Sequence, residues 1–310
     1  MIRGLLSRCL HPHMQLKIYP QLAKLPARRA YQLAEKIAHQ EALQFQPSSN
    51  SDLSIFIRGL SQLSPESMAD QNRVDEFLFQ RARMMAFDHL DCYIMPKLFS
   101  QKHAIPITLR GDQHLKTAQE KGSGVILLIS HFGRFFMLGP GLGLNQYPFA
   151  MLTTPITADN PAYAHPGTFQ YWHQKLTNTL AFSGDEHITT SDPLKRIFRL
   201  LKQNKIVLIA FDGTETNSPD KLTVPFFQQT LSLPMGALRV AEKSNAQLIY
   251  AATHNAKEGH GVEIKFHPLP QQPLAAIKEA VTILAKELTQ EPWYWWQWPA
   301  LHTLCPTMKQ

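Results

Sequence analysis

The chain has 310 residues, of which 44% are hydrophobic and 18% charged, so its composition is that of a globular protein and excludes an intrinsically disordered one. Its formal net charge of +7 favours an acidic partner, such as nucleic acid, an anionic membrane or an acidic protein, but no basic run selects nucleic acid. The three cysteines, Cys9, Cys92 and Cys305, lie far apart and form no CxxC motif. This spacing supports neither a disulfide framework nor a zinc site and fits a reducing compartment.

The first ten residues carry an amphipathic pattern. Apolar side chains recur at the spacing of one helical stripe, and two arginines lie off it. The pattern fits an interfacial helix on an anionic membrane, and it fits equally a short helix that covers the core. We expect no membrane span and no signal peptide, because no apolar run approaches the roughly 18–20 residues of a span. The stripe consists of Ile2, Leu5, Leu6, Cys9 and Leu10.

Residues 1–104 are predicted to form a helical portion. The segment Pro26–Phe45 is rich in helix formers and starts with a proline, which suits a first helical turn. The segment Asn72–Phe99 has a second long helical pattern, which is broken near Pro96. No obvious linker follows, so we expect this portion to pack on the core formed by residues 105–310 as one structural unit.

From residue 105 onward, short apolar runs alternate with amphipathic segments. This alternation is typical of a parallel sheet covered by helices on both faces. We therefore predict an α/β fold: a central, mostly parallel β-sheet flanked by helices, with a helical N-terminal portion. Buried strands are expected at Val125–Ser130, Phe149–Thr154, Ile206–Asp212 and Gln247–His254, and helices at Asp192–Lys205, Pro234–Ala246 and Leu274–Leu288.

Two of the predicted strands end in residues that can carry chemistry. His131 follows the first buried strand, and Asp212 and Glu215 follow the strand that starts at Ile206. Sites in parallel sheets form at the carboxyl ends of the strands, so an imidazole and a carboxylate could meet there. An imidazole that takes a proton, oriented by a carboxylate, is the minimum for general-base catalysis. A histidine at a strand end can also be purely structural.

Other common site motifs are missing from the sequence. It contains no GxxxxGK[ST], no GxGxxG, no GxSxG and no HExxH. The 14 histidines show no spacing typical of a metal site. We therefore expect no metal and no redox cofactor.

Three blocks of sequence resemble one protein family. The block GVILLISHFGRFFML (124–138) is similar to the signature of the late lipid A acyltransferases, within the lysophospholipid acyltransferase group. A strand ending in Asp, a polar loop and a Val-Pro-Phe-Phe segment (205–254) match the second block of that family. The segment ELTQEPWYWWQWPALH (287–302) resembles its C-terminal aromatic block. The three blocks occur in the family's order, which is more specific than any single motif.

The resemblance implies transfer of an acyl group from an acyl-carrier-protein or CoA thioester to a lipid acceptor, as in lipid A and lipopolysaccharide biosynthesis. It places the general base at His131 and the family's aspartate at Asp212. An acyl carrier protein would be the donor partner, and the basic surface would suit both this acidic protein and an anionic membrane. The expected location is the cytoplasmic face of the inner membrane, with peripheral contact, or the cytoplasm, with no nucleic acid bound.

The chain departs from the family at two positions. Phe136 stands five residues after His131, where the family has an acid, and Thr154 precedes Pro155, where the family has an arginine. Three interpretations follow. The acid has moved to Asp212 or Glu215; or the acceptor is an amine, which needs less help from a base; or catalysis is lost and the protein binds acyl or carrier partners as a scaffold.

The residues after His131 are candidates for substrate binding. Arg134 could contact a phosphate of the acceptor or of the carrier's prosthetic arm. Backbone N–H groups near Gly133, with Arg134, could stabilise the oxyanion of a tetrahedral adduct. Phe135 and Phe136 could line an acyl groove or simply pack in the core. The segment WYWWQW (293–298) fits either an aromatic belt at a membrane interface or core packing.

Overall fold

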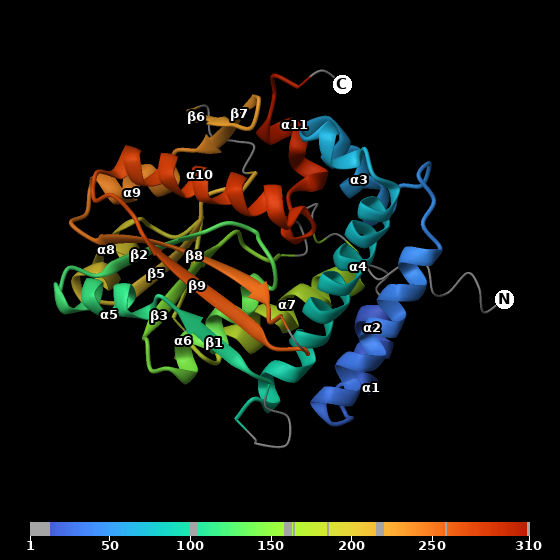
Figure 1. Ribbon diagram of the computed structural model, residues 1–310. Helices are drawn as coiled ribbons and strands as arrows, with labels where there is room; N and C mark the ends of the chain where they lie inside the picture. Colours follow the sequence, from blue (N-terminus) through green and yellow to red (C-terminus); the bar gives the residue numbers. More distant parts are fainter. Residues whose placement is uncertain are drawn as a thin grey trace.

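The computed structural model describes residues 13–99, 105–157, 163, 165–184, 186–214, 220–257 and 259–308. The amphipathic stripe at residues 2–10 and the candidate acid Glu215 lie outside these described residues. Figure 1 shows a twisted central sheet between helices, with a further group of N-terminal helices along one side.

Within the described residues the main sheet has seven strands in the order β1-β9-β8-β2-β5-β3-β4. All neighbouring pairs are parallel except β8 and β9. The predicted α/β fold with a mostly parallel central sheet and a helical N-terminal portion is therefore confirmed. The strands are β1 (Ile107–Arg110), β2 (Val125–Ile129), β3 (Phe149–Thr153), β4 (His187–Thr189), β5 (Ile206–Ala210), β8 (Gln247–Asn255) and β9 (Val262–Pro268).

Strand β2 lies in the middle of the sheet because both of its faces are apolar. All five of its residues are buried, and it pairs with β8 on one side and β5 on the other. A continuous apolar run without alternation is what a strand covered on both faces requires. The residue that follows it is therefore held at the centre of the carboxyl edge of the sheet.

Helices cover both faces of the sheet (Figure 1). Buried side chains of α8, α9 and α10 form one hydrophobic cluster with one face, and those of α5 and α6 contribute to a second cluster on the other. The helices are α1 (Tyr19–Leu22), α2 (Ala27–Leu43), α3 (Asp52–Leu63), α4 (Gln71–Ile94), α5 (Asp112–Glu120), α6 (Leu138–Leu144), α7 (Pro166–Leu180), α8 (Lys195–Lys202), α9 (Gly236–Glu242), α10 (Pro273–Gln290) and α11 (Leu301–Leu304). None of the described helices is long and apolar enough to cross a membrane.

Helix α4 binds both the N-terminal helix α3 and the C-terminal aromatic residues through the side chain of Arg81. Its Arg81 is fully buried and donates two hydrogen bonds to the carboxylate of Asp52 on α3. The same guanidinium donates to the carbonyl oxygens of Trp293 and Trp295, at 3.0 and 2.7 Å. A planar guanidinium suits this combined role because its donors are fixed in a fork. The N-terminal helices therefore hold the C-terminal aromatic residues in place.

The sequence patterns missed several elements, among them α3, α7, β4 and one hairpin. A hairpin of β6 (Lys221–Phe226) and β7 (Gln229–Pro234) forms a separate two-stranded antiparallel sheet. The Val-Pro-Phe-Phe segment ends in this hairpin, and Phe227 adopts a left-handed φ of 51° in its turn. Pro225 lies within β6, where it is tolerated because the pair has free edges.

Candidate active site

The fold brings His131 and Asp212 together at the carboxyl edge of the sheet. Strands β2 and β5 are parallel neighbours, with Ile129 opposite Ala210. His131 and Asp212 each lie two residues beyond this pair, so strand register alone places them side by side. Nδ1 of His131 lies 2.7 Å from Oδ1 of Asp212.

The carboxylate of Asp212 is buried and held by several donors. Its two oxygens accept the backbone N–H of His131 at 3.0 Å each, and Oδ2 also accepts Nε1–H of Trp295 at 3.0 Å. A carboxylate that only accepts fixes the proton of the imidazole on Nδ1. Nε2 of His131 is then left as the basic nitrogen.

The imidazole of His131 is partly open to solvent, with 29% of its side chain exposed, whereas Asp212 is not exposed at all. Burial of the ring opposes its protonation, but the charge and the hydrogen bond of Asp212 outweigh burial and raise the pKa of His131. A stronger base at the edge of the sheet can accept a proton from a bound molecule.

The C-terminal aromatic segment, defined here as Pro292–Trp298, forms a second layer around this pair. Trp296 donates its backbone N–H to the carbonyl of His131 at 2.8 Å and its Nε1–H to the carbonyl of Gly133 at 2.7 Å. The side-chain amide of Gln297 lies 3.0 Å from Nδ1 of His131. The atom of Gln297 at this distance is the amide nitrogen Nε2; if Nδ1 keeps its proton toward Asp212, the oxygen of the same amide is the better partner, and a rotation of the side chain exchanges the two.

The tryptophans of this segment pack in the core rather than form an exposed belt. Trp295 and Trp298 are buried, and Trp293 and Trp296 are partly buried. The sequence did not identify Trp295 and Gln297 as site residues. The aromatic block of the family resemblance was the signal that could have pointed to them.

Gly133 passes so close to β8 that no side chain fits there. Its φ is +63°, and a Cβ would lie 1.9 Å from the carbonyl oxygen of Thr253. Its N–H donates to the carbonyl of Tyr294 at 2.8 Å, so this amide is occupied by the aromatic segment. Gly133 therefore serves here to lock the loop after His131 against β8 and the aromatic segment.

We expect Gly133→Ala to lower the free energy of unfolding by about 3 kcal/mol or more, because a left-handed alanine and a backbone clash are combined. Gly122→Ala is the matched control: its φ is +72°, but nothing lies within 4 Å of the added Cβ. This control should lose only about 1–2 kcal/mol. Urea unfolding of both variants measures the difference, and equal losses would show that the contact with Thr253 does not matter.

The side chain of Arg134 points into the protein interior. It is fully buried and bound to both carboxylate oxygens of Asp91 on α4, through Nε at 2.6 Å and Nη2 at 2.5 Å. Its Nη1 donates to the carbonyls of His260 and Gly261. These contacts leave the guanidinium no free face for a substrate phosphate, and they anchor the loop that carries His131.

Phe135 and Phe136 lie on different sides of the loop. The ring of Phe135 is partly exposed and meets the imidazole of His131 edge-on at 5.2 Å between centroids. Phe136 is buried, with the ammonium of Lys175 4.6 Å from its ring centroid. Lys175 is itself ion-paired with Asp88. Phe135 can therefore touch a substrate at His131, whereas Phe136 packs in the interior.

The backbone after Gly133 offers free donors. Among the described residues, the N–H groups of Arg134 and Phe135 have no acceptor within hydrogen-bond distance. They open a 3₁₀ turn (Phe135–Met137) that continues into α6. Unpaired N–H groups at the start of a helical segment favour negative charge. No cluster of three possible metal ligands occurs in the described part of the chain.

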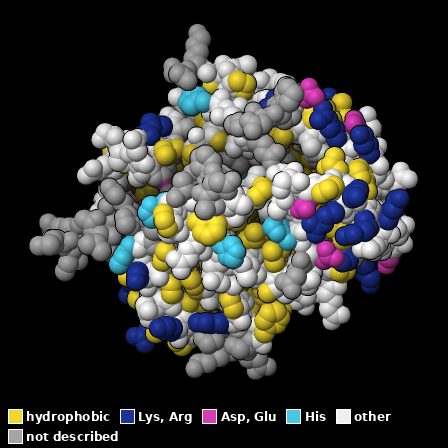
Figure 2. All heavy atoms as spheres, turned by 180° about the vertical axis from the view of Figure 1, so that it is seen from behind, with side chains coloured by type: hydrophobic (Ala, Val, Ile, Leu, Met, Phe, Trp, Pro, Cys, Tyr) yellow, Lys and Arg dark blue, Asp and Glu magenta, His cyan; other side chains and the backbone are white. Residues whose placement is uncertain are grey.

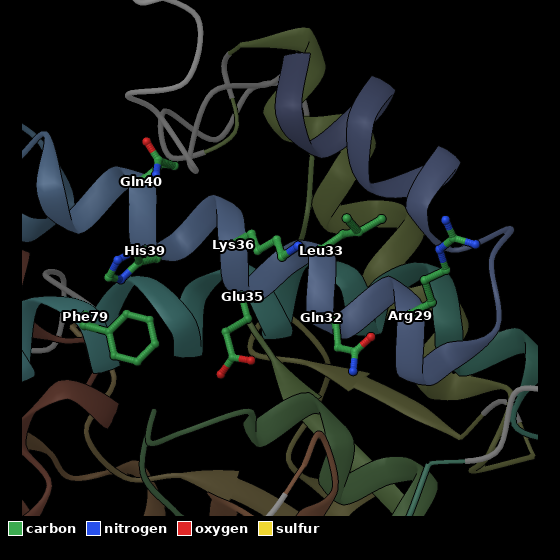
Figure 3. A pocket seen from close by; sticks show the side chains of 8 residues that line it. All are labelled: Arg29, Gln32, Leu33, Glu35, Lys36, His39, Gln40 and Phe79. Atoms are coloured by element: carbon green, nitrogen blue, oxygen red, sulfur yellow. The ribbon is translucent and has the colours of Figure 1, made fainter.

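An open groove of about 880 Å³ lies elsewhere, on the outer side of α2. Figure 3 shows that most of its side chains come from α2, with Phe79 reaching in from α4. Its only described acid, Glu35, is ion-paired with Arg83. The groove contains neither His131 nor Asp212, and we assign it no chemistry. It is lined by Arg29, Gln32, Leu33, Glu35, Lys36, His39, Gln40 and Phe79.

Comparison with known proteins adds to this geometry. Among curated proteins, the comparison found no match. The sequence profile of the family described as "Bacterial lipid A biosynthesis acyltransferase" matches residues 13–298, a range that includes His131, Asp212 and the whole aromatic segment. With nearly the full length of the chain covered, this protein belongs to the bacterial lipid A biosynthesis acyltransferase family.

Proposed function

We propose that this protein transfers an acyl group from an acyl-carrier-protein or CoA thioester to a hydroxyl or amine of a lipid acceptor, with His131 as general base. The observation that carries the proposal is the contact of 2.7 Å between Nδ1 of His131 and the buried carboxylate of Asp212. It leaves Nε2 as the proton acceptor at a partly exposed position. Asp212 thereby takes the place of the acid that is missing at Phe136.

The reaction would use His131 for two proton transfers, first to Nε2 from the acceptor and then from Nε2 to the leaving thiolate. Nε2 of His131 removes the proton of the acceptor hydroxyl as its oxygen attacks the thioester carbonyl, and Asp212 stabilises the imidazolium that forms. The oxyanion of the adduct would be stabilised by the free N–H groups of Arg134 and Phe135. The adduct then expels the thiolate, which takes the proton from Nε2 and leaves as the thiol. An amine acceptor attacks first and gives its proton to Nε2 afterwards.

A basic surface supports an acidic carrier protein as donor. Figure 2 shows Lys and Arg side chains gathered on the side where α8 lies. Helix α8 buries Ile197, Leu200 and Leu201 and exposes Lys195, Arg199 and Lys202. Such a surface attracts an acidic protein or an anionic lipid headgroup. The charge supports our proposal that the protein lies peripherally at the cytoplasmic face of the inner membrane; the alternative location is the cytoplasm.

The proposed base predicts an acidic limit to activity. His131 must be neutral to accept a proton, and Asp212 raises the pKa of His131 above its ordinary value of 6.5. The fraction of neutral imidazole therefore falls as the pH drops through this raised pKa. We expect kcat/KM to decline on acidification with a midpoint above 6.5. A midpoint below 6 would contradict the pairing of His131 with Asp212.

The decisive test is a donor and acceptor assay. Purified protein is mixed with acyl-carrier-protein thioesters of several chain lengths, with and without lipid A precursors or simple amines, and thioester loss is followed by mass spectrometry. Acceptor-dependent loss establishes the transferase, and the product identifies ester or amide formation. Binding of the carrier without loss of any thioester would favour the scaffold alternative.

A further inference from the structure

A second cluster of a histidine and carboxylates lies behind the aromatic segment. His254, at the end of β8, is only 4% exposed. Its Nδ1 lies 2.8 Å from Oε2 of Glu291, and its Nε2 lies 3.3 Å from Oε1 of Glu287. Both ring nitrogens therefore face carboxylate oxygens. The proposed reaction uses none of these three groups.

This arrangement favours a protonated ring. A neutral imidazole has one N–H and would turn a lone pair toward the other carboxylate, whereas an imidazolium attracts both: Nδ1 is hydrogen-bonded to Glu291, and Nε2, which makes no hydrogen bond, lies within ion-pair distance of Glu287. Burial disfavours the charge, but the contacts of the ring with the carboxylates of Glu287 and Glu291 outweigh burial and raise the pKa of His254. Among the described residues, Lys265 on β9 opposes protonation by its charge, and His267 on β9, whose own pKa is lowered by burial, Tyr250 on β8 and Tyr294 also lie close by.

The end of α10 needs this positive charge. Glu287 and Glu291 are four residues apart; Glu287 lies in the last turn of α10, and Glu291 is the capping residue directly after it. Like charges at this spacing repel each other, and carboxylates at a helix C-terminus also meet the negative end of the helix dipole. The imidazolium of His254 neutralises both effects from the neighbouring strand.

The aromatic segment begins directly after Glu291. The neighbour of His254 in β8, Asn255, donates its N–H to the hydroxyl of Tyr294 at 3.1 Å. The next residue, Trp295, donates to Asp212, and Trp296 binds the carbonyl of His131. A shift at the end of α10 would therefore be passed on to the pair of His131 and Asp212.

We propose that protonated His254 is a positioning residue: it clamps the end of α10 through Glu287 and Glu291, so that the aromatic segment keeps His131 and Asp212 aligned. The inference rests on the proposed function only for its effect on rate. A 1 Å misplacement of catalytic groups can cost about 10²-fold in rate, so loosening the clamp is expected to lower kcat.

The clamp has a defined pH dependence. The pKa of His254 in the folded protein is raised, so its stabilising contribution is fully present below the ordinary value of 6.5 and is lost as the pH rises through the raised pKa. His131 needs the opposite state, because it must be neutral. Together the two histidines predict a bell-shaped dependence of kcat on pH. The rate falls on acidification as His131 is protonated, which sets the acidic limb, and falls on alkalinisation as His254 loses its proton, which sets the alkaline limb.

The test compares wild type with Glu291→Gln, whose side chain is 31% exposed and whose replacement should be tolerated by the fold. Glu279→Gln, an exposed position on the same helix, is the matched control. Removing the charge of Glu291 should move the alkaline limb of kcat down by about one pH unit or more, with KM little changed. Glu279→Gln should reproduce the wild-type profile. Identical profiles for the two variants would overturn the proposal.

A substrate-free measurement separates this inference from the proposed function. Hydrogen exchange, corrected for intrinsic rates, is followed at the backbone amides of Gly133 and Trp296. The first donates to the carbonyl of Tyr294 and the second to the carbonyl of His131, so both report on the contact between the aromatic segment and the loop of His131. Their protection should fall as the pH rises through the pKa of His254, measured by NMR, and should fall about one unit earlier in Glu291→Gln. Protection that is independent of this titration would overturn the clamp, even if acyl transfer is found. If protection is lost as predicted but no acyl transfer is found in any assay, the clamp stands and only the proposed function is rejected.

Discussion

Replacing His131 with glutamine is expected to lower kcat/KM for acyl transfer roughly 10²–10⁴-fold. Glutamine can still donate a hydrogen bond to Asp212, but it has no nitrogen that can take a proton at the position of Nε2. The fold should be retained, because 29% of the His131 side chain is exposed and its burial adds little to the core. Initial rates of thioester loss with a working acceptor measure the effect.

His302→Gln is the matched control for this variant, because His302 is an exposed histidine on α11, outside the site. It should have the rate and the melting temperature of wild type. If His131→Gln also keeps the wild-type rate while carrier binding is unchanged, His131 is not the base and the proposed mechanism is wrong.

Replacing Asp212 with asparagine is expected to have a comparable effect, again a loss of roughly 10²–10⁴-fold in kcat/KM. The imidazolium formed during the reaction would lose its counter-charge, and the amide could direct its N–H at Nδ1 and favour the wrong tautomer. Because Asp212 raises the pKa of His131, the acidic limb of the rate profile should also move to lower pH.

The comparison for this prediction is Glu215→Gln, because the sequence allowed either acid as partner of His131. We expect Glu215→Gln to keep most of the activity and to leave the acidic limb where it is in wild type. A larger loss in Glu215→Gln than in Asp212→Asn would transfer the role of the acid to Glu215.

Phe136 stands where the family resemblance leads us to expect an acid, and its position fits the proposed site. Its ring is buried against Lys175, so a carboxylate there would lie in the interior and compete with Asp88 for the ammonium. Asp212 already occupies Nδ1 of His131 through a bond set by the register of β2 and β5. A phenylalanine at this position is therefore compatible with the proposed pairing of His131 and Asp212.

The sequence by itself determined the class of fold and predicted the approximate place of the candidate site. The apolar run of β2 shows no alternation, which predicts a strand buried on both faces, and His131 follows it directly. The same reasoning placed Asp212 after β5. Because parallel strands end on one edge, the pattern of apolar runs was enough to predict that the two side chains could meet. The order of the three sequence blocks pointed to the family.

Long-range contacts decided the rest. Local pattern cannot tell that Arg134 turns inward to Asp91, that Arg81 binds the carbonyl of Trp295, or that Gly133 donates to Tyr294, since each pair is separated by 40 residues or more in the chain. Sequence periodicity reports which face of an element is apolar, whereas a buried polar group takes whichever partner the packed chain brings within reach. The tertiary structure alone therefore placed the aromatic segment beside the candidate pair of His131 and Asp212 and Arg134 in the interior.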